Sequence, residues 1–578
     1  MTAADTYMNL RAFADELARC GVREVCTSPG SRSTPLVLTL AREPRLRATS
    51  HIDERAGAFF ALGAAKASGM PVALACTSGT AAANYAPAVI EAHEARVPLL
   101  VLTADRPPEL RDLGAGQTID QVKLYGNAAK WFMEVDDHPA TPERLRWMRQ
   151  LACRACWTAL DGRPGPVHLN FSLREPLVLD APLAADEPGG GGRAGGRPWV
   201  TRTPQVAAPA ASVIDAVAGE LTARPRAVVV AGRAERDAAL GPALVRFAEL
   251  GGFPLLAEPT SGARRGPAAI AHYDALLRDP AWAASVAPEL VLRVGDLPTS
   301  KPLRQWLAGL GAETEQIVLD PETAWQDPAG VAATLLPADP RALLTAIIPQ
   351  LPREPRAGEW LDAWTRADRA AARAIAEVLG PAGLSEPRIA AELGARLPPE
   401  ATLVVASSMP IRDVETFFPV RPDPFRVLAN RGANGIDGTT STAFGVAAAA
   451  PGPVVLLTGD VALQHDIGGL LAARRPGAAP LTIVLVDNDG GGIFAFLPVA
   501  GAGVGYEEHV ATAHGLDFAH AAALYGLDHV RIADPDRFGE AIDAALRSPR
   551  STLIHVRTDR AGNVALHRAV WEAVRAAV

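Results

Sequence analysis

The sequence lacks the features that mark membrane, secreted and disulfide-stabilised proteins. No apolar run reaches the roughly 18 residues that a membrane-spanning helix needs. The N-terminal segment carries acidic residues early and has no apolar block of the kind found in signal peptides. Five cysteines in 578 residues are too few for a disulfide framework. These absences predict a cytoplasmic protein with no membrane span.

The chain also lacks an excess of positive charge. Lysine and arginine number 56 against 64 aspartate and glutamate, a net charge of −8, so the overall balance does not favour a nucleic-acid partner. Hydrophobic residues at 48% and charged residues at 21% exclude a largely disordered or fibrous protein. Cys153 and Cys156 form a CxxC pair in a helical segment. Because no second ligand pair accompanies them, we interpret them as packing residues.

Length and composition predict several domains. At about 150 residues per domain, the chain is long enough for three or four. A glycine-rich stretch over 186–199 and a weaker proline-containing break over 349–355 divide it. The predicted blocks are an N-terminal domain over 1–185, a glycine-rich linker over 186–205, a central domain over 206–355 and a C-terminal domain over 356–578.

Short apolar runs alternate with helical segments in every block. These runs cover 22–30, 71–79 and 97–107, then 226–233, 252–262 and 290–296, then 401–408, 451–460, 481–489 and 551–559. Such runs are typical of parallel strands covered by helices on both faces. The predicted fold is therefore α/β, with three consecutive doubly wound parallel-sheet domains. Ligands of such sheets bind beyond the carboxyl ends of the strands.

Polar residues follow two successive strands of the last block. One strand ends in Gly459 and Asp460, and the next is followed by Asn488 and then Gly490. Carboxylate and carboxamide oxygens suit Mg²⁺, which completes its shell with phosphate oxygens. Glycines let the backbone approach a ligand closely, and helices starting after each strand would favour phosphate. Either cluster alone could be an ordinary turn, but the pair predicts a diphosphate and Mg²⁺ site.

This pattern resembles the GDG…NN motif of thiamine diphosphate enzymes. Val461 stands where that motif usually has its last glycine, and Asp487 stands where it has its first asparagine. The resemblance implies that Asp460, Asn488 and the carbonyl of Gly490 hold Mg²⁺ or Mn²⁺. It leaves open which of Asp487 and Asp489 approaches the metal.

Glu54 matches the glutamate of these enzymes, which lies after a short strand at a helix start. In the family this residue, with a pKa raised by an apolar cleft, serves N1′ of the cofactor's pyrimidine ring. By itself it could be a first-turn residue that favours the helix dipole. Because family members take this glutamate and the diphosphate site from different subunits, the resemblance implies a homodimer, alone or paired into a homotetramer.

Cationic residues lie at several predicted strand ends, namely Arg32, Arg106, Lys301, Arg412 and Arg431. A single arginine here would be an ordinary surface residue, but together they predict a substrate with several carboxylates, which guanidinium groups bind in pairs. Segments such as SPGSRSTPL, HIDERAGAFFALGAAKASG, TADRPPELRD and NRGANGIDGTTSTAFG resemble one family closely. They are similar to the 2-succinyl-5-enolpyruvyl-6-hydroxy-3-cyclohexene-1-carboxylate synthases, the thiamine diphosphate enzymes of menaquinone biosynthesis.

This resemblance implies a role for each matching residue. Glu54 is the catalytic partner of N1′, and Ile436 props the cofactor into a V shape beside Ser408 and Gly459. The implied ligands of substrate carboxylates and of the bound intermediate are Ser31, Arg32, Arg106, Gln117, Lys301, Ser408, Arg412 and Arg431. Ile493 and Phe494 would form an apolar wall near the reacting carbon.

The implied reaction is decarboxylation of 2-oxoglutarate followed by 1,4-addition of the succinyl carbanion equivalent to isochorismate. The central block has no G-x-G-x-x-G motif after a strand, so we expect no dinucleotide or flavin there. Two alternatives stay open. One is a generic thiamine diphosphate-dependent 2-oxoacid decarboxylase or carboligase, and the other is a non-catalytic scaffold with the same fold.

Overall fold

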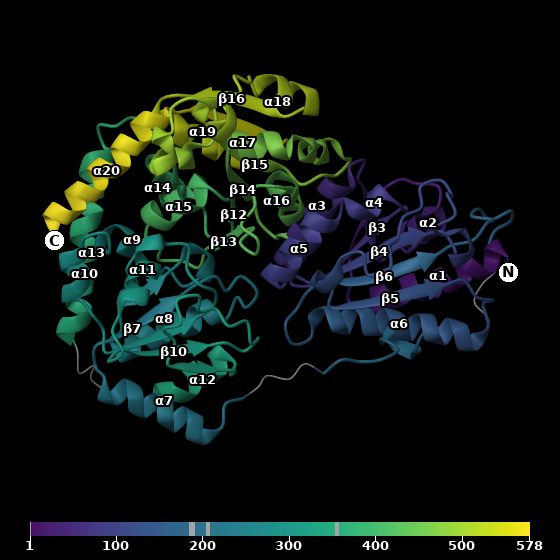
Figure 1. Cartoon of the computed structure of the whole chain (residues 1–578), viewed down its shortest axis with the longest axis horizontal. Coiled ribbons are helices and arrows are strands. Elements are labelled where there is room, and N and C mark those ends of the chain that lie inside the picture. Colours follow the sequence, from purple (N-terminus) through teal and green to yellow (C-terminus); the bar gives the residue numbers. More distant parts are fainter. Residues whose placement is uncertain (1, 184–190, 204–207, 353–357) are drawn as a thin grey trace. The chain divides into compact units, whose positions relative to one another are not determined.

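Three parallel β-sheets organise the chain in the computed structural model, which describes residues 2–183, 191–203, 208–352 and 358–578 (Figure 1). The strand orders are β2-β1-β3-β4-β6-β5, then β11-β10-β9-β7-β8, then β13-β12-β14-β15-β17-β16. The prediction of three α/β domains with parallel sheets is thus confirmed. In the described part of the chain, no helix combines the length and apolar character needed to cross a membrane.

The first sheet is built around strands that are buried on both faces. Its strands are β1 (Glu24–Thr27), β2 (Arg47–Ser50), β3 (Val72–Cys76), β4 (Leu99–Asp105), β5 (Trp131–Asp136) and β6 (Val167–Ser172). Its helices are α1 (Ala3–Arg19), α2 (Thr34–Arg42), α3 (Glu54–Ser68), α4 (Thr80–Ala83), α5 (Ala86–Ala95) and α6 (Pro142–Leu160). Every residue of β3 and β4 is buried, as their unbroken apolar runs predict.

A later part of the chain belongs to the same compact unit as this sheet. The unit comprises residues 1–204 together with 430–451 and 464–479, which include α16 (Thr439–Ala449). Helix α16 packs on α3 at a close crossing. A Cβ atom at Gly63 would lie 2.0 Å from the carbonyl oxygen of Thr442, and one at Gly445 would lie 1.9 Å from that of Phe60. The crossing therefore needs glycine on both helices.

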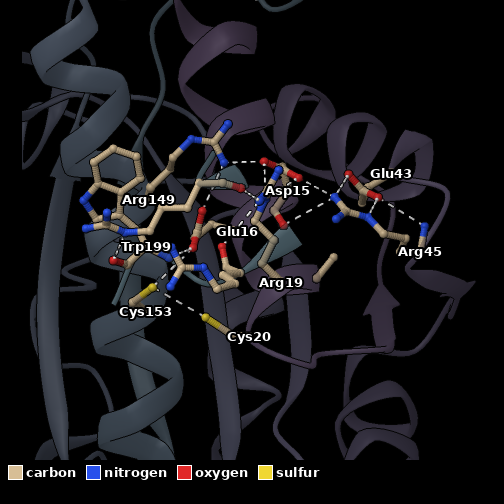
Figure 2. Close-up of polar contacts among 12 residues, drawn as sticks. Asp15, Glu16, Arg19, Cys20, Glu43, Arg45, Arg149, Cys153 and Trp199 are labelled. Atoms are coloured by element: carbon tan, nitrogen blue, oxygen red, sulfur yellow. Dashed lines mark hydrogen bonds and ion pairs between the residues drawn. The ribbon is translucent and has the colours of Figure 1, made fainter. Parts of the chain in front are cut away.

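A buried ionic cluster joins α1 to α6 (Figure 2). Arg149 of α6 contacts Asp15 and lies 3.1 Å from Glu16, and both Arg149 and Glu16 are at most 1% exposed. Cys20 and Cys153 lie beside them with their sulfur atoms 3.6 Å apart. All five cysteines of the chain are free and buried. Cys153 and Cys156 lie in a helix, as predicted, but the sequence did not indicate that Cys20 and Glu16 would meet Cys153.

The end of the glycine-rich stretch and the residue that follows it contact the same two helices. The Trp199 amide donates to Glu16, and the Val200 carbonyl accepts from the Trp157 indole at 2.8 Å. The predicted linker over 186–205 lies partly outside the described residues, at 186–190 and 204–205. Its boundaries, and those of the three predicted domains, stay predictions.

We expect Arg149→Met to lower the free energy of unfolding by about 3–5 kcal/mol, because it leaves the buried Glu16 carboxylate without its counter-charge. Chemical denaturation followed by circular dichroism measures this change. Arg146→Met is the matched control on the same helix, since Arg146 forms a solvent-exposed pair with Glu143. That control should stay within about 0.5 kcal/mol of the wild type. Equal stability of the two variants would contradict a stabilising role of the cluster.

The second compact unit contains the other two sheets. The central sheet consists of β7 (Ala227–Ala231), β8 (Leu255–Ala257), β9 (Leu290–Val294), β10 (Glu315–Leu319) and β11 (Thr334–Leu336). The last sheet consists of β12 (Thr402–Val405), β13 (Arg426–Ala429), β14 (Val454–Gly459), β15 (Leu481–Asp487), β16 (Asp528–Ile532) and β17 (Thr552–Arg557). One hydrophobic core runs through both, because residues of β7, β9, β12 and β14 belong to the same buried cluster.

Helices of the second unit cover both of its sheets. Around the central sheet they are α7 (Ala211–Ala223), α8 (Leu240–Gly251), α9 (Tyr273–Leu276), α10 (Pro280–Ser285), α11 (Lys301–Gly309) and α12 (Pro340–Ile347). The remaining helices are α13 (Gly358–Leu379), α14 (Glu386–Arg396), α15 (Met409–Phe417), α17 (Asp460–His465), α18 (Ala519–Tyr525), α19 (Pro535–Arg547) and α20 (Arg560–Ala577). The fully buried Trp364 of α13 contacts the rings of Trp282, Trp306 and Trp360.

Candidate functional site

The first and last sheets share one strand order. In each, successive strands are added toward one edge of the sheet and then, from a switch point, toward the other edge. This switch point lies between β1 and β3 in the first sheet and between β12 and β14 in the last. Crevices at such points, beyond the carboxyl ends of the strands, are where open α/β sheets bind ligands. Many of the predicted site residues follow these four strands, so each group is described within its own unit.

Asp460 and Asn488 follow the neighbouring strands β14 and β15 in the second unit. Asp460 is 2% exposed and accepts hydrogen bonds from the amides of Val461 at 2.7 Å and Gly490 at 2.8 Å. The side-chain oxygen of Asn488 is buried and has no hydrogen-bond partner among the described residues. A buried acceptor in this state is costly unless a ligand completes it.

The donor set at this place fits a hard divalent cation. A carboxylate oxygen, a carboxamide oxygen and a backbone carbonyl, here that of Gly490, are the types of group that Mg²⁺ and Mn²⁺ prefer. Gly490 has φ 138°, and a Cβ atom there would lie 2.4 Å from the carbonyl oxygen of Ala511. Only glycine can place its backbone in this position. The residues present therefore fit the predicted metal group.

The structure separates the roles of Asp487 and Asp489. Asp487 lies within 4.8 Å of Asp460 and His514, counting one ligand atom from each, and its carboxylate also meets His555 at 2.8 Å. Although burial opposes it, the hydrogen bond from His555 lowers the pKa of Asp487. Asp489 instead accepts from the backbone amides of His514 and Gly515. Of the two, Asp487 is the residue that approaches the candidate metal group.

At the candidate metal group, the sequence did not indicate one residue, and one expected helix is not formed. The Nε2 atom of His514 lies 3.2 Å from Asp460, and its position 54 residues away along the chain offered no sequence signal. A regular helix was expected after each strand end, but only the 3₁₀ segment Gly492–Phe496 follows β15. The consecutive glycines 490–492 disfavour a helix start, because their backbone loses the most freedom when it is ordered.

In the first unit, Arg106 and Gln117 meet at the end of β3. Arg106 donates to the hydroxyl of Ser78, and the Gln117 side-chain amide donates to the Ser78 carbonyl at 3.0 Å. Desolvation, and then the positive charge of Arg32, lower the pKa of Arg106. Ser78, which our sequence reasoning did not select, is the residue that joins them.

Arg32 is more enclosed than its neighbour Ser31. Its guanidinium donates to the Leu173 carbonyl at 2.9 Å and pairs with Glu175 at 3.3 Å. Within the described part of the chain, its buried Nε atom has no partner. Ser31 is exposed. The carboxyl ends of β1, β3 and β4 thus present an exposed hydroxyl and two clustered guanidinium groups, an arrangement suited to an anionic ligand.

Glu54 is the first residue of α3, and three residues separate it from the end of β2. Asp53 caps this helix by accepting from the amides of Arg55 and Ala56. Glu54 is half-buried, and its carboxylate accepts from the Asn84 side chain at 3.5 Å, at the limit of a hydrogen bond. Because α3 is braced by α16, the position of this carboxylate is fixed by helix packing as well as by the cap.

Lys301 and Arg412 lie on two helices that share one buried carboxylate. Lys301 is the exposed first residue of α11, whose N-cap Ser300 donates to Asp274 at 2.7 Å. Thr416 of α15, the helix that carries Arg412, donates to the same carboxylate at 3.1 Å. Asp274 therefore ties the two cation-bearing helices together, although no sequence motif marked it.

Ser408 has a strained backbone at the start of α15. Its φ of 76° and ψ of −132° are rare for a residue with a side chain and cost about 1–3 kcal/mol. The guanidinium of Arg412 donates to the Ser408 carbonyl. Burial lowers the pKa of Arg412, and the positive charge of Arg304 lowers it further. Strain and clustered positive charge at one strand end are typical of a ligand site.

The remaining predicted residues lie on loops after β13 and β15. Arg431 and Ile436 belong to the first unit, where Glu91 of α5 accepts from the amides of Gly432 and Ala433 at 2.9 and 2.6 Å. Ile493 and Phe494 lie in the second unit, on the 3₁₀ segment after the glycines. Phe494 is 36% exposed, so it is not an ordinary core residue.

Comparison with known proteins finds relatives that match nearly the whole chain. Residues 10–124 match the thiamine pyrophosphate enzyme N-terminal binding domain, 195–405 the middle domain and 411–556 the C-terminal binding domain. A 2-succinyl-5-enolpyruvyl-6-hydroxy-3-cyclohexene-1-carboxylate synthase of Chloroflexus aurantiacus is 44% identical over 97% of this chain and 95% of its own. The chain belongs to this synthase family.

Other relatives extend the match across distant organisms. The synthase of Geobacillus kaustophilus is 43% identical, covering 97% of both chains. That of Haloarcula marismortui is 41% identical, covering 97% of this chain and 96% of its own. The resemblance to the synthase family is therefore confirmed over nearly the full length of the chain. The individual roles of the site residues stay predictions.

Proposed function

We propose that the protein decarboxylates 2-oxoglutarate and adds the resulting succinyl unit to isochorismate in a 1,4 sense. The product is 2-succinyl-5-enolpyruvyl-6-hydroxy-3-cyclohexene-1-carboxylate, in menaquinone biosynthesis. The observation that carries this proposal is membership of the synthase family across the full chain. It is supported by the co-occurrence of Glu54, Asp460, Asn488 and Gly490, which count against a non-catalytic scaffold.

The cofactor would be held from both of its ends. Asp460, Asn488 and the carbonyl of Gly490 would bind Mg²⁺ or Mn²⁺ and through it a diphosphate, beside Gly459 and Ser408. Ile436 would support the cofactor between its rings, and Glu54 would hold a proton at N1′ of its pyrimidine. When bound, thiamine diphosphate supplies a nucleophilic carbon and a ring that takes up the electrons released with carbon dioxide.

The cationic residues would bind and orient the two acidic substrates. Both substrates carry two carboxylates, which matches the clustered guanidinium groups of Arg32 and Arg106 and the cations on α11 and α15. Ser31, Gln117, Lys301, Ser408, Arg412 and Arg431 complete the proposed set of polar ligands. Ile493 and Phe494 would exclude water from the reacting carbon, which protects it from premature protonation.

We further propose that the protein works as a homodimer, either alone or paired into a tetramer, in the cytoplasm. In this arrangement Glu54 of one subunit would serve the cofactor whose diphosphate is held by the other. Sedimentation of the purified protein measures the assembly directly. A species with the 60.5 kDa mass of a single chain under turnover conditions would exclude it.

The function is tested by carbon dioxide release from 2-oxoglutarate with thiamine diphosphate and Mg²⁺, in the presence and absence of isochorismate. We expect release to depend on isochorismate, and mass spectrometry to find the succinylated product. Release at full rate without isochorismate would indicate a generic decarboxylase. No release under either condition, with cofactor bound, would indicate a scaffold.

A further inference from the structure

The two ends of the Asn488 carboxamide have different surroundings. Its Nδ2 atom donates a hydrogen bond to Oε1 of Glu386 at 2.9 Å. Its Oδ1 atom is buried and makes no hydrogen bond with any residue that the structure describes. A carboxylate only accepts hydrogen bonds, so it selects the NH₂ end of the carboxamide and leaves the oxygen pointing away. The free oxygen is the atom that would bind a metal ion.

Glu386 is built into the domain as a fixed group. It is the first residue of α14, is 4% exposed, and also accepts from the Thr558 hydroxyl at 2.8 Å. Burial, and then the charge of Asp413, raise the pKa of Glu386 to about 7, although the hydrogen bonds from Asn488 and Thr558 lower it. A Cβ atom at Gly492 would lie 2.7 Å from Nδ2 of Asn488, so the carboxamide is closely confined on that side as well.

We propose that Glu386 is a positioning residue that orients Asn488 for the metal ion. The inference rests on the proposed Mg²⁺ and thiamine diphosphate site and deepens it. Without Glu386, the carboxamide could rotate by half a turn and present its NH₂ group, whose hydrogens repel a cation. Groups that orient a metal ligand in this way typically contribute about 10–100-fold to metal affinity.

The test measures metal binding directly rather than turnover. Free Mn²⁺ is counted by electron paramagnetic resonance during titration of the protein with thiamine diphosphate present, and Mg²⁺ binding is measured by calorimetry. We expect Glu386→Met to weaken Mn²⁺ binding by about 10–100-fold. Glu386→Gln should bind close to the wild type, because its side-chain oxygen still accepts from Asn488.

Thr558→Val is the matched control. It removes the other hydrogen bond on the same carboxylate but leaves the contact with Asn488, so it should bind Mn²⁺ as the wild type does. If circular dichroism shows that Glu386→Met does not fold, Glu386→Asp replaces it, since the shorter side chain does not reach Asn488. A folded Met or Asp variant with wild-type affinity would overturn the inference. If the wild type itself takes up no Mn²⁺ or Mg²⁺, the proposed cofactor site fails instead.

Discussion

Glu54→Gln is expected to abolish turnover while thiamine diphosphate still binds. A glutamine has nearly the same shape, but it cannot hold and release the proton at N1′ of the pyrimidine. Loss of a positioned acid–base group costs about 10²–10⁴-fold in rate. Steady-state kinetics with both substrates measures kcat, and calorimetry measures cofactor binding to the same preparation.

Asp53→Asn is the control for this variant. Asp53 precedes Glu54 and caps α3 with its side-chain oxygen, and asparagine can accept the same hydrogen bonds from Arg55 and Ala56. It removes one negative charge next to Glu54 without removing the proposed proton carrier. We expect it to retain activity. Undiminished turnover by Glu54→Gln would refute the role given to this residue.

Asp460→Asn is expected to lose metal binding and, with it, tight binding of the cofactor. The substitution removes the charge of a buried carboxylate that would contact the cation directly. The loss should exceed the roughly 10–100-fold effect of a residue that only orients a ligand. Calorimetric titration with Mg²⁺ and thiamine diphosphate measures both affinities.

Asp489→Asn is the matched control for Asp460. Its carboxylate accepts from the backbone amides of His514 and Gly515, and an asparagine oxygen can keep these bonds. We expect its metal affinity to stay near that of the wild type. If the two variants lose affinity equally, the metal group is not centred on Asp460.

The two inactive variants together test the proposed sharing of sites between subunits. A mixed dimer of Glu54→Gln and Asp460→Asn chains would contain one site with both changes and one site with neither. Refolding or co-expressing the two chains should therefore restore part of the activity. No restoration in isolated mixed dimers would contradict sites formed by two subunits.

Local sequence carried most of the information about the fold. Strands such as β3, β4, β14 and β15 are buried on both faces, so their unbroken apolar runs reveal them without any tertiary knowledge. The apolar runs of the sequence missed the edge strands β2, β5, β11, β13 and β16, and also the inner strands β6 and β10, whose apolar residues are mixed with polar ones. Most residues of β2 are exposed, and those of β16 are only partly buried. An edge strand pairs on one side only and needs no apolar run, so it leaves no such signal.

In the candidate site, too, some residues could be predicted from the sequence and others could not. The chemical types of Asp460, Asn488 and Glu54, and their places after strands, could be read from the chain because strand ends and helix starts are local features. Partners brought from elsewhere could not. Ser78 joins Arg106 to Gln117, Asp274 joins two helices, and their sequence separations from these partners follow no motif.

The sequence by itself determined the family, the three α/β sheets and the residue types at the strand ends, because burial pattern and turn chemistry act over a few neighbouring residues. Only the tertiary structure decided which way those side chains face. Glu386 accepts from the NH₂ group of Asn488 and so leaves the Asn488 oxygen available for a ligand. Gly63 and Gly445 let α16 pack closely on α3, the helix that begins with Glu54. Such contacts depend on the packing of distant segments, which no local pattern encodes.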